Sequence, residues 1–249
     1  EELGIPYQEI QLIAADTLTT PNAGPTSASR VTYVTGMAAL KAARALKKSL
    51  QSVAEEILGE KDLLFEANSV YSASRPEKKI SFKDLAKRCH LSGRPIVETI
   101  WHDNTTQDVD KETGQGNAYS AYSYAAQLAE VEVDTETGKA ELLRVVNATD
   151  AGQIIDPPGL QNQLNGCLGS AGIDSALFEE SVFDQTTGHM LTANMIDYKW
   201  RTFAELPAIS NVVLETPVES HRFHAIGVGE VATSPGPSAI LMAVSNAIG

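Results

Sequence analysis

This sequence of 249 residues has only two cysteines and no recognisable nucleotide-binding motif. The two cysteines, Cys89 and Cys167, lie far apart and form no CxxC pair, so they cannot by themselves supply the four thiolates that an iron–sulfur cluster usually needs. Two free thiols in a reducing compartment are a better interpretation of this pair than a disulfide. No GxGxxG or P-loop pattern occurs, so dinucleotide and phosphate-loop chemistry have no support in the sequence.

Positive charge and long apolar runs are also lacking. Lys and Arg number 19 against 32 Asp and Glu, which gives a formal net charge of −13 at pH 7. Such a surface repels phosphate backbones and argues against a nucleic-acid partner. No apolar run approaches the ~18 residues of a membrane-spanning helix, and no signal peptide is recognisable at the start. We therefore expect no membrane association and a cytoplasmic location.

The residues that are present are typical of a folded globular protein. Hydrophobic residues make up 43% of the chain, and Gly and Pro are spread along it, which suits one large domain or two smaller lobes. Residues 1–6 resemble the last turn of a helix that ends at Gly4 and Pro6, and the helix expected at the other end is still apolar near Gly249. These ends indicate a piece of a longer chain.

The order of the expected elements predicts an α+β (mixed α/β) protein with two lobes. We expect a first lobe at residues 1–101, a polar linker loop at 102–117 and a second lobe at 118–249. The apolar spacing in the first lobe predicts a short strand over 9–15, a long helix over 29–58 that ends at Gly59, a hairpin over 63–74 and a helix capped by Ser81.

The second lobe begins with the clearest local pattern in the sequence. Two strands, 126–134 and 139–150, are joined by a turn that ends in Gly138, where a positive φ is cheap. Further along, the sequence predicts a helix over 157–177, a hairpin turn over 184–188, a strand over 211–215 and a last helix from about residue 239.

The loop at residues 227–237 holds the candidate catalytic residue, Glu230. Gly227 and Gly229 precede it, and glycines allow the backbone to approach a ligand closely, while the prolines that follow stiffen the loop. A carboxylate held between apolar neighbours in such a loop would be poorly solvated, which suits a general base. An ordinary turn whose Glu230 faces water is the alternative, and the residues alone leave it open.

Three other segments are chemically suggestive. Small hydroxylated residues at 21–30, with Arg30 at their end, would leave backbone N–H groups free for an anion or the polar edge of a pterin, although a simple serine N-cap explains them too. The small residues at 162–172 imply close packing against a backbone or a ligand. His221 and His224 could share a metal only on a helix, and the glycine-rich loop beyond them argues against one, so no protein-bound metal site is expected.

In this order and at these spacings, three stretches resemble the molybdopterin-binding subunit of the xanthine dehydrogenase/aldehyde oxidase family, the molybdenum hydroxylases. They are residues 20–30, residues 129–138 with 150–152 following, and residues 227–230. The resemblance covers essentially the whole chain, which is similar to the last third of that subunit. It implies a molybdenum-cofactor-binding domain of the aldehyde oxidase/xanthine dehydrogenase type.

The resemblance also implies roles for particular residues. Glu230 matches the family's catalytic glutamate, and Gln163 matches a glutamine that contacts the cofactor. This sequence departs from the pattern because the helix after Gly166 is one residue longer than usual, so Gln161 is the alternative match, and Ile226 stands where many relatives carry lysine. The remaining residues implied to bind the cofactor are Ser27, Ala28, Ser29, Arg30 and Gly229.

The chemistry that the resemblance implies is that of an oxidoreductase. A molybdenum–molybdopterin cofactor, with or without a cytosine dinucleotide, would hydroxylate an electron-poor C–H carbon of a purine-like N-heterocycle or an aldehyde with oxygen from water, with Glu230 as the base on Mo–OH. Iron–sulfur clusters and FAD would lie on other domains or subunits. The implied partners are the upstream part of the molybdopterin subunit, those electron-transfer subunits and a small-molecule substrate, and the chain alone is expected to be inactive.

Other functions remain open at this stage. A relative acting on nicotinate, CO or a thioester would differ in pocket residues, most of which would lie outside this chain. A cofactor-free structural or assembly module would keep the fold, but nothing structural would then demand a Glu at position 230. An unrelated acidic α+β binding domain would require the three ordered stretches to be coincidental.

Overall fold

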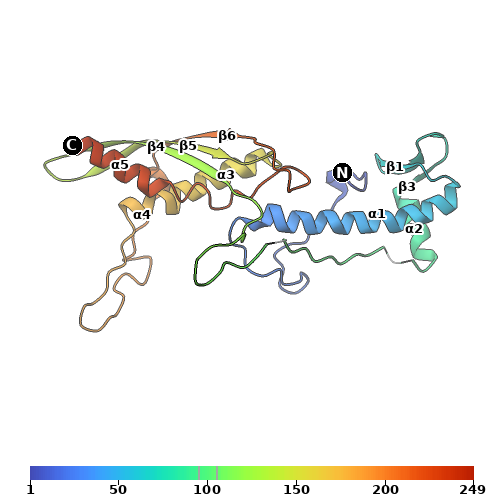
Figure 1. Cartoon of the computed structure of the whole chain (residues 1–249), viewed down its shortest axis with the longest axis horizontal. Helices are drawn as coiled ribbons and strands as arrows, with labels where there is room; N and C mark the ends of the chain where they lie inside the picture. The colour runs from blue at the N-terminus through green and yellow to red at the C-terminus, as the bar shows by residue number, and fades with distance from the viewer. Residues whose placement is uncertain (95, 105) are drawn as a thin grey trace. The chain divides into compact units, whose positions relative to one another are not determined.

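The computed structural model describes residues 1–94, 96–104 and 106–249, which form two compact units. The first unit contains Glu1–Pro25 and Val34–Asp103, and the second contains Thr26–Tyr33 and Asn104–Gly249 (Figure 1). Each unit has its own hydrophobic core. Residues 26–33, which sequence analysis placed in the first lobe, thus group with the second unit.

The first unit packs two helices against a small antiparallel sheet. Its core joins Leu50 and Val53 of the long helix to Val70 of the sheet and Leu85 of the short helix. The long helix is confirmed: it ends at Gly59, whose φ of 68° is the left-handed conformation predicted for that position. The elements are α1 (Gly36–Leu58), β1 (Leu63–Glu66), β2 (Ser69–Ser72), β3 (Lys79–Ser81) and α2 (Phe82–Leu91).

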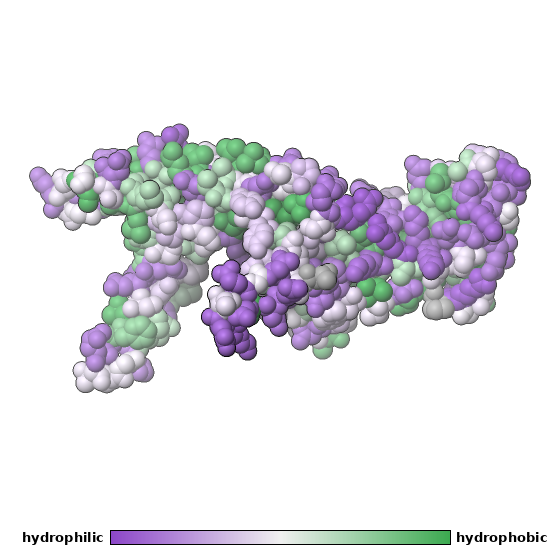
Figure 2. Space-filling model, in the orientation of Figure 1, coloured by the Kyte–Doolittle hydropathy of each residue, from purple (hydrophilic) through white to green (hydrophobic). Residues whose placement is uncertain are grey.

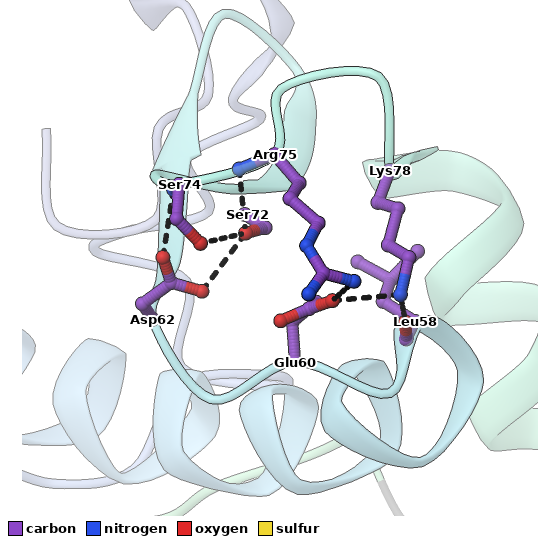
Figure 3. Close-up of polar contacts among 7 residues, drawn as sticks. All are labelled: Leu58, Glu60, Asp62, Ser72, Ser74, Arg75 and Lys78. Carbon is purple, nitrogen blue, oxygen red and sulfur yellow. Dashed lines mark hydrogen bonds and ion pairs between the residues drawn. The ribbon is translucent and has the colours of Figure 1, made fainter.

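The hairpin predicted over 63–74 is confirmed as β1 and β2, and β3 extends it. Figure 3 shows polar contacts at the open end of this hairpin, where β1 begins and β2 ends. The Asp62 carboxylate accepts hydrogen bonds from the Ser72 hydroxyl at 2.9 Å and the Ser74 N–H at 2.7 Å, while Glu60 pairs with Arg75 and Lys78. These contacts attach the hairpin to the end of α1. The predicted N-cap is also confirmed, since the Ser81 hydroxyl accepts from the Asp84 N–H.

The strand predicted over residues 9–15 is wrong. Tyr7–Glu9 form a short 3-10 turn, and residues 10–15 have no regular structure in the described chain. Ile10, Leu12 and Ile13 are exposed, and no strand in the part of the chain that the structure describes pairs with them. A strand gains its hydrogen bonds from a partner, so alternation alone was insufficient here.

The second unit is a three-stranded sheet with helices on one face. β4 (Tyr124–Val133) pairs antiparallel with β5 (Ala140–Asp150), and β5 pairs in parallel with β6 (Ala208–Leu214). Figure 1 shows the helices on one side of this sheet, and Val145 of β5 packs with Leu164 and Ile240 in a common core. The helices are α3 (Pro157–Cys167), α4 (Ile173–Leu177) and α5 (Gly236–Ile248).

Two short π-helical segments interrupt the helical regions. Val31–Thr35 precedes α1, and Leu168–Gly172 joins α3 to α4, so the helix predicted over 157–177 is present but not uniformly α. A π-turn accommodates one more residue than an α-turn, and such segments often occur at functional sites. The segment at 168–172 offers a physical account of the extra residue noted in this helix.

The outward face of the sheet and the 184–188 turn are exposed. Figure 2 shows hydrophobic residues along the side of the second unit where the strands lie, and Leu128, Val212 and Leu214 of this sheet are more than half exposed. The turn at 184–188 forms as predicted, and an isolated bridge joins Phe183 to Met190 beyond it, with the Leu191 N–H also donating to the carbonyl of Val182. Among the described residues, no helix combines the length and apolar character needed to cross a bilayer.

Candidate functional site

A cavity of about 490 Å³ in the second unit brings together three segments that are far apart in the sequence. They are the loop before α1, the segment that leads from β5 into α3, and the loop before α5. A volume of this size suits a small-molecule or cofactor site. The cavity is lined by Thr26, Ser27, Ser29, Val31, Thr32, Ala151, Gln153, Ile154, Ile155, Asp156, Gly159, Leu160, Gln163, Ala225, Ile226, Val228, Gly229 and Glu230.

Glu230 and Ser29 are joined by two hydrogen bonds. The backbone N–H of Ser29 donates to Oε2 of Glu230 at 3.1 Å, and the backbone N–H of Glu230 donates to the Ser29 hydroxyl at 3.0 Å. Ala28 and Ser29 have φ angles of 52° and 54°, which is the left-handed region that non-glycine residues seldom adopt. Two such residues in succession are held by their surroundings. They do not by themselves mark a ligand site, because Ala67 and Asn68 adopt the same region in the turn between β1 and β2.

Position 227 must be a glycine because the backbone of Ser29 lies against it. A Cβ at position 227 would overlap the carbonyl oxygen of Ser29, and one at position 229 would lie 3.3 Å from the Ser29 hydroxyl. The glycines of the 227–230 loop thus let the backbone approach closely, as their spacing predicted, but the partner they admit is another loop of the same chain.

Gln163 and Cys167, one turn apart on α3, hold the residue before Glu230. Nε2 of Gln163 donates to the carbonyl of Gly229 at 2.6 Å, and the Cys167 thiol donates to the same oxygen at 2.7 Å. Nε2 of Gln163 also lies 3.2 Å from the Cys167 sulfur. Gln161 instead bonds Asn165 and does not line the cavity, so the structure brings Gln163 to the site.

Two residues that sequence analysis missed support the same loop. The Ser123 hydroxyl donates to the carbonyl of Gly227 at 2.6 Å, and Nε2 of Gln127 donates to the carbonyl of Ala232 at 2.7 Å. Gln127 lies on the side of β4 that carries Ala129 and Val131 toward the core. A polar residue in that register was a usable signal, because buried amides need partners.

The structure places the other candidate residues unequally. Ser27 lines the cavity, whereas Ala28 and Arg30 are not among its lining residues. Glu230 is exposed in the described chain, which differs from the poorly solvated carboxylate expected from its apolar neighbours. Local neighbours along a loop do not determine solvation, because the walls that exclude water come from distant segments.

Two of the small residues at 162–172, Gly169 and Gly172, make the close contacts expected of this segment. A Cβ at Gly236, the first residue of α5, would lie 2.5 Å from the carbonyl of Gly172, and one at Gly169 would lie 3.1 Å from the side chain of Leu206. At Gly172 the cause is therefore packing against another backbone, one of the two explanations that the sequence left open, whereas Gly169 packs against a side chain.

His221 and His224 do not lie on a helix. His221 is buried against the ring of Tyr33, with ring centroids 4.9 Å apart, and His224 occupies a left-handed turn with φ of 54°. Across the part of the chain that the structure describes, no group of three or more His, Cys, Asp or Glu side chains is arranged to hold a metal ion.

Comparison with known proteins identifies the family. The model of the molybdopterin cofactor-binding domain matches residues 1–207, and the chain belongs to this family. It is 27% identical over 253 aligned positions to a putative xanthine dehydrogenase molybdenum-binding subunit of Escherichia coli (strain K12), covering all of this chain and 32% of the relative. It is 29% identical to the carbon monoxide dehydrogenase large chain of Afipia carboxidovorans, covering 99% of this chain and 29% of the relative.

Solved structures agree with this assignment. Carbon monoxide dehydrogenase from Oligotropha carboxidovorans matches 98% of this chain with a TM-score of 0.77 and 27% identity. The aldehyde oxidoreductase from Desulfovibrio desulfuricans matches 95% with a TM-score of 0.68 and 28% identity. The chain spans 29% and 23% of these two proteins, and about 30% of the curated relatives above. The α+β fold is that of a molybdenum-cofactor-binding domain.

Proposed function

We propose that this chain contributes the base and part of the cofactor pocket to the active site of a molybdenum-dependent hydroxylase. The observation that carries the proposal is Glu230, fixed by Ser29 at the wall of a mostly apolar cavity that also displays hydroxyl and amide side chains. Relatives named for xanthine, nicotine and carbon monoxide chemistry support an oxidoreductase.

The lining residues fit a pterin cofactor. A pterin is flat and polar-edged, and the cavity offers hydroxyls of Ser27, Ser29 and Thr32 together with the amide of Gln153. Gln163 has both amide hydrogens directed at protein acceptors, so its Oε1 is the atom that remains to accept a hydrogen bond from a ligand. When bound, the cofactor supplies the redox and oxygen-transfer chemistry that the protein side chains lack.

Glu230 acts as the proton acceptor. Its Oε2 takes the Ser29 N–H, while Oε1 makes no hydrogen bond among the residues that the structure describes. A carboxylate anchored through one oxygen presents the other in a defined direction, which a general base requires before its reaction partner arrives. Exclusion of water from Glu230 comes from whatever covers this exposed side chain in the assembled enzyme.

The whole enzyme hydroxylates an electron-poor carbon of an N-heterocycle or an aldehyde, with water as the oxygen source. Relatives called large chains, or subunits of a complex, favour partner subunits, and we assign the iron–sulfur and flavin centres to those. The cofactor is molybdenum–molybdopterin. Analysis of the cofactor released from the enzyme tests whether it carries a cytosine dinucleotide. We propose a cytoplasmic location for the enzyme.

The test is Glu230→Gln in the cofactor-loaded enzyme. We expect molybdenum and pterin content to stay at the wild-type level while kcat falls by about 10²–10⁴, because a general base contributes that much. Turnover is measured over a panel of purines, pyridines and aldehydes with an artificial electron acceptor.

The matched control for that test is Glu132→Gln, which removes an exposed carboxylate from β4, outside the cavity lining. It should leave kcat unchanged. Near-normal turnover of the loaded Glu230→Gln enzyme would contradict the proposal.

A further inference from the structure

We propose that Ser29 is the positioning residue for Glu230, and that it acts through its hydroxyl on the backbone and through its own N–H on the carboxylate. The inference rests on the proposed role of Glu230 as a base and adds a second residue to it. Ser29 does not touch the reacting atoms in this proposal; it determines where the carboxylate lies.

The two hydrogen bonds restrain Glu230 at both ends. The bond from the Glu230 N–H to the Ser29 hydroxyl, at 3.0 Å, fixes the main chain from which the side chain starts. The bond from the Ser29 N–H to Oε2, at 3.1 Å, fixes the carboxylate in which it ends. A free glutamate side chain samples many rotamers, so two restraints from one residue leave little freedom in the orientation of Oε1.

The left-handed backbone at Ser29 makes this double contact possible. With φ of 54°, its N–H and its hydroxyl both meet residue 230, while its carbonyl oxygen packs against Gly227. This conformation costs free energy in a non-glycine residue, and structures retain it where surrounding contacts determine it. Ser27, in the same loop and lining the same cavity, makes no side-chain hydrogen bond to the 227–230 loop within the described residues.

Hydrogen exchange of individual amides tests the two bonds separately in the full 249-residue chain, without cofactor or substrate. Ser29→Gly removes the hydroxyl and suits the left-handed φ, and Ser29→Ala is a second variant with a Cβ. In both, protection of the residue-230 amide should fall by about 2- to 10-fold, the loss expected for one hydrogen bond. Ser27→Ala is the matched control and should leave that amide unchanged.

The second bond is tested from the other partner. Glu230→Gln keeps the residue-230 N–H but replaces a charged acceptor with a neutral one, and charged acceptors make stronger hydrogen bonds. The Ser29 amide proton should therefore shift upfield in this variant, while the residue-230 amide keeps its protection. Unchanged protection at residue 230 in both Ser29 variants would overturn the proposed contact, whatever the activity of the enzyme.

The positioning role is measured in the cofactor-loaded enzyme. A displaced base affects the chemical step rather than substrate binding, so Ser29→Gly should lower kcat by about 10- to 100-fold with KM within about twofold of wild type. Wild-type kcat in a Ser29→Gly enzyme that has lost the contact would overturn the role. If the Glu230→Gln enzyme also keeps wild-type kcat, Glu230 is not the base. The failure of the positioning role and the failure of the proposed function are therefore distinguishable.

Discussion

At the scale of single residues, the site depends on backbone positions as much as on functional groups. Gly227 exists as glycine because the Ser29 carbonyl occupies the space of its Cβ, and Gly229 presents its carbonyl to both Gln163 and Cys167. A substitution at Gly227 or Gly229 would displace Glu230 by moving the backbone of the loop. Its effect on activity can therefore be separated from the effect of removing the Glu230 carboxylate.

Two glycine substitutions should have opposite effects on stability. Gly227→Ala forces Cβ into the Ser29 carbonyl and should lower the free energy of unfolding by about 1–3 kcal/mol, the usual penalty of overpacking. Gly166→Ala lies in α3, where the added Cβ would have no atom of another described segment within 4 Å, and should raise the free energy of unfolding by about 0.5–1 kcal/mol. Urea unfolding of both variants is the measurement, and a stabilised Gly227→Ala protein would show that the two loops do not meet as described.

At the scale of elements, hydrogen bonds to Asp62 stabilise the open end of the β1–β2 hairpin, where β1 begins and β2 ends. Those from Ser74 and Ser72 hold the pKa of the Asp62 carboxyl below the ordinary aspartate value of 3.8 (Figure 3). Because the folded pKa is lower than the unfolded one, folding favours the charged form. The stabilisation is fully present above pH 3.8 and is lost as the pH falls through the folded pKa.

Asp62→Asn should therefore lower stability at neutral pH and weaken the acid dependence of unfolding below about pH 4. The measurement is the free energy of unfolding against pH for the wild type and the variant. Glu77→Gln removes an exposed carboxyl from the turn between β2 and β3, serves as the control and should keep the wild-type profile. If the Asp62→Asn protein keeps the full acid dependence of the wild type, Asp62 does not contribute to the loss of stability at low pH.

At the scale of the whole molecule, the cavity displays residues that a bound cofactor would need to bury. Glu230, Gln163 and Ser27 are all exposed in the described chain, whereas bound cofactors usually have most of their surface covered. The chain also spans only about 30% of the curated relatives. Further walls of the site therefore belong, in our proposal, to other parts of the enzyme.

The expected consequence concerns metal content. The 249-residue chain purified alone should contain little molybdenum or pterin, while the native complex that contains it should hold about one of each, with iron present. Elemental analysis and the fluorescence of oxidised pterin measure these contents. Stoichiometric molybdenum in the isolated chain would refute this division of the site.

The sequence by itself determined the elements whose signals are local. The apolar spacing of α1 with Gly59 at its end, the turn at Gly138 between β4 and β5, and the Ser81 cap each depend on neighbouring residues. The family, too, could be identified from ordered motifs, because each motif is a short continuous stretch. The role of Glu230 stays a prediction until its substitution is tested.

Only the tertiary structure decided which distant segments meet. Ser29 and Glu230 are 201 residues apart, and nothing near either one specifies that each donates a hydrogen bond to the other. The absence of a strand at 9–15 and the support from Gln127 have the same origin. A strand needs a partner and a polar side chain needs an acceptor, and in a folded chain both are supplied by packing rather than by sequence neighbours.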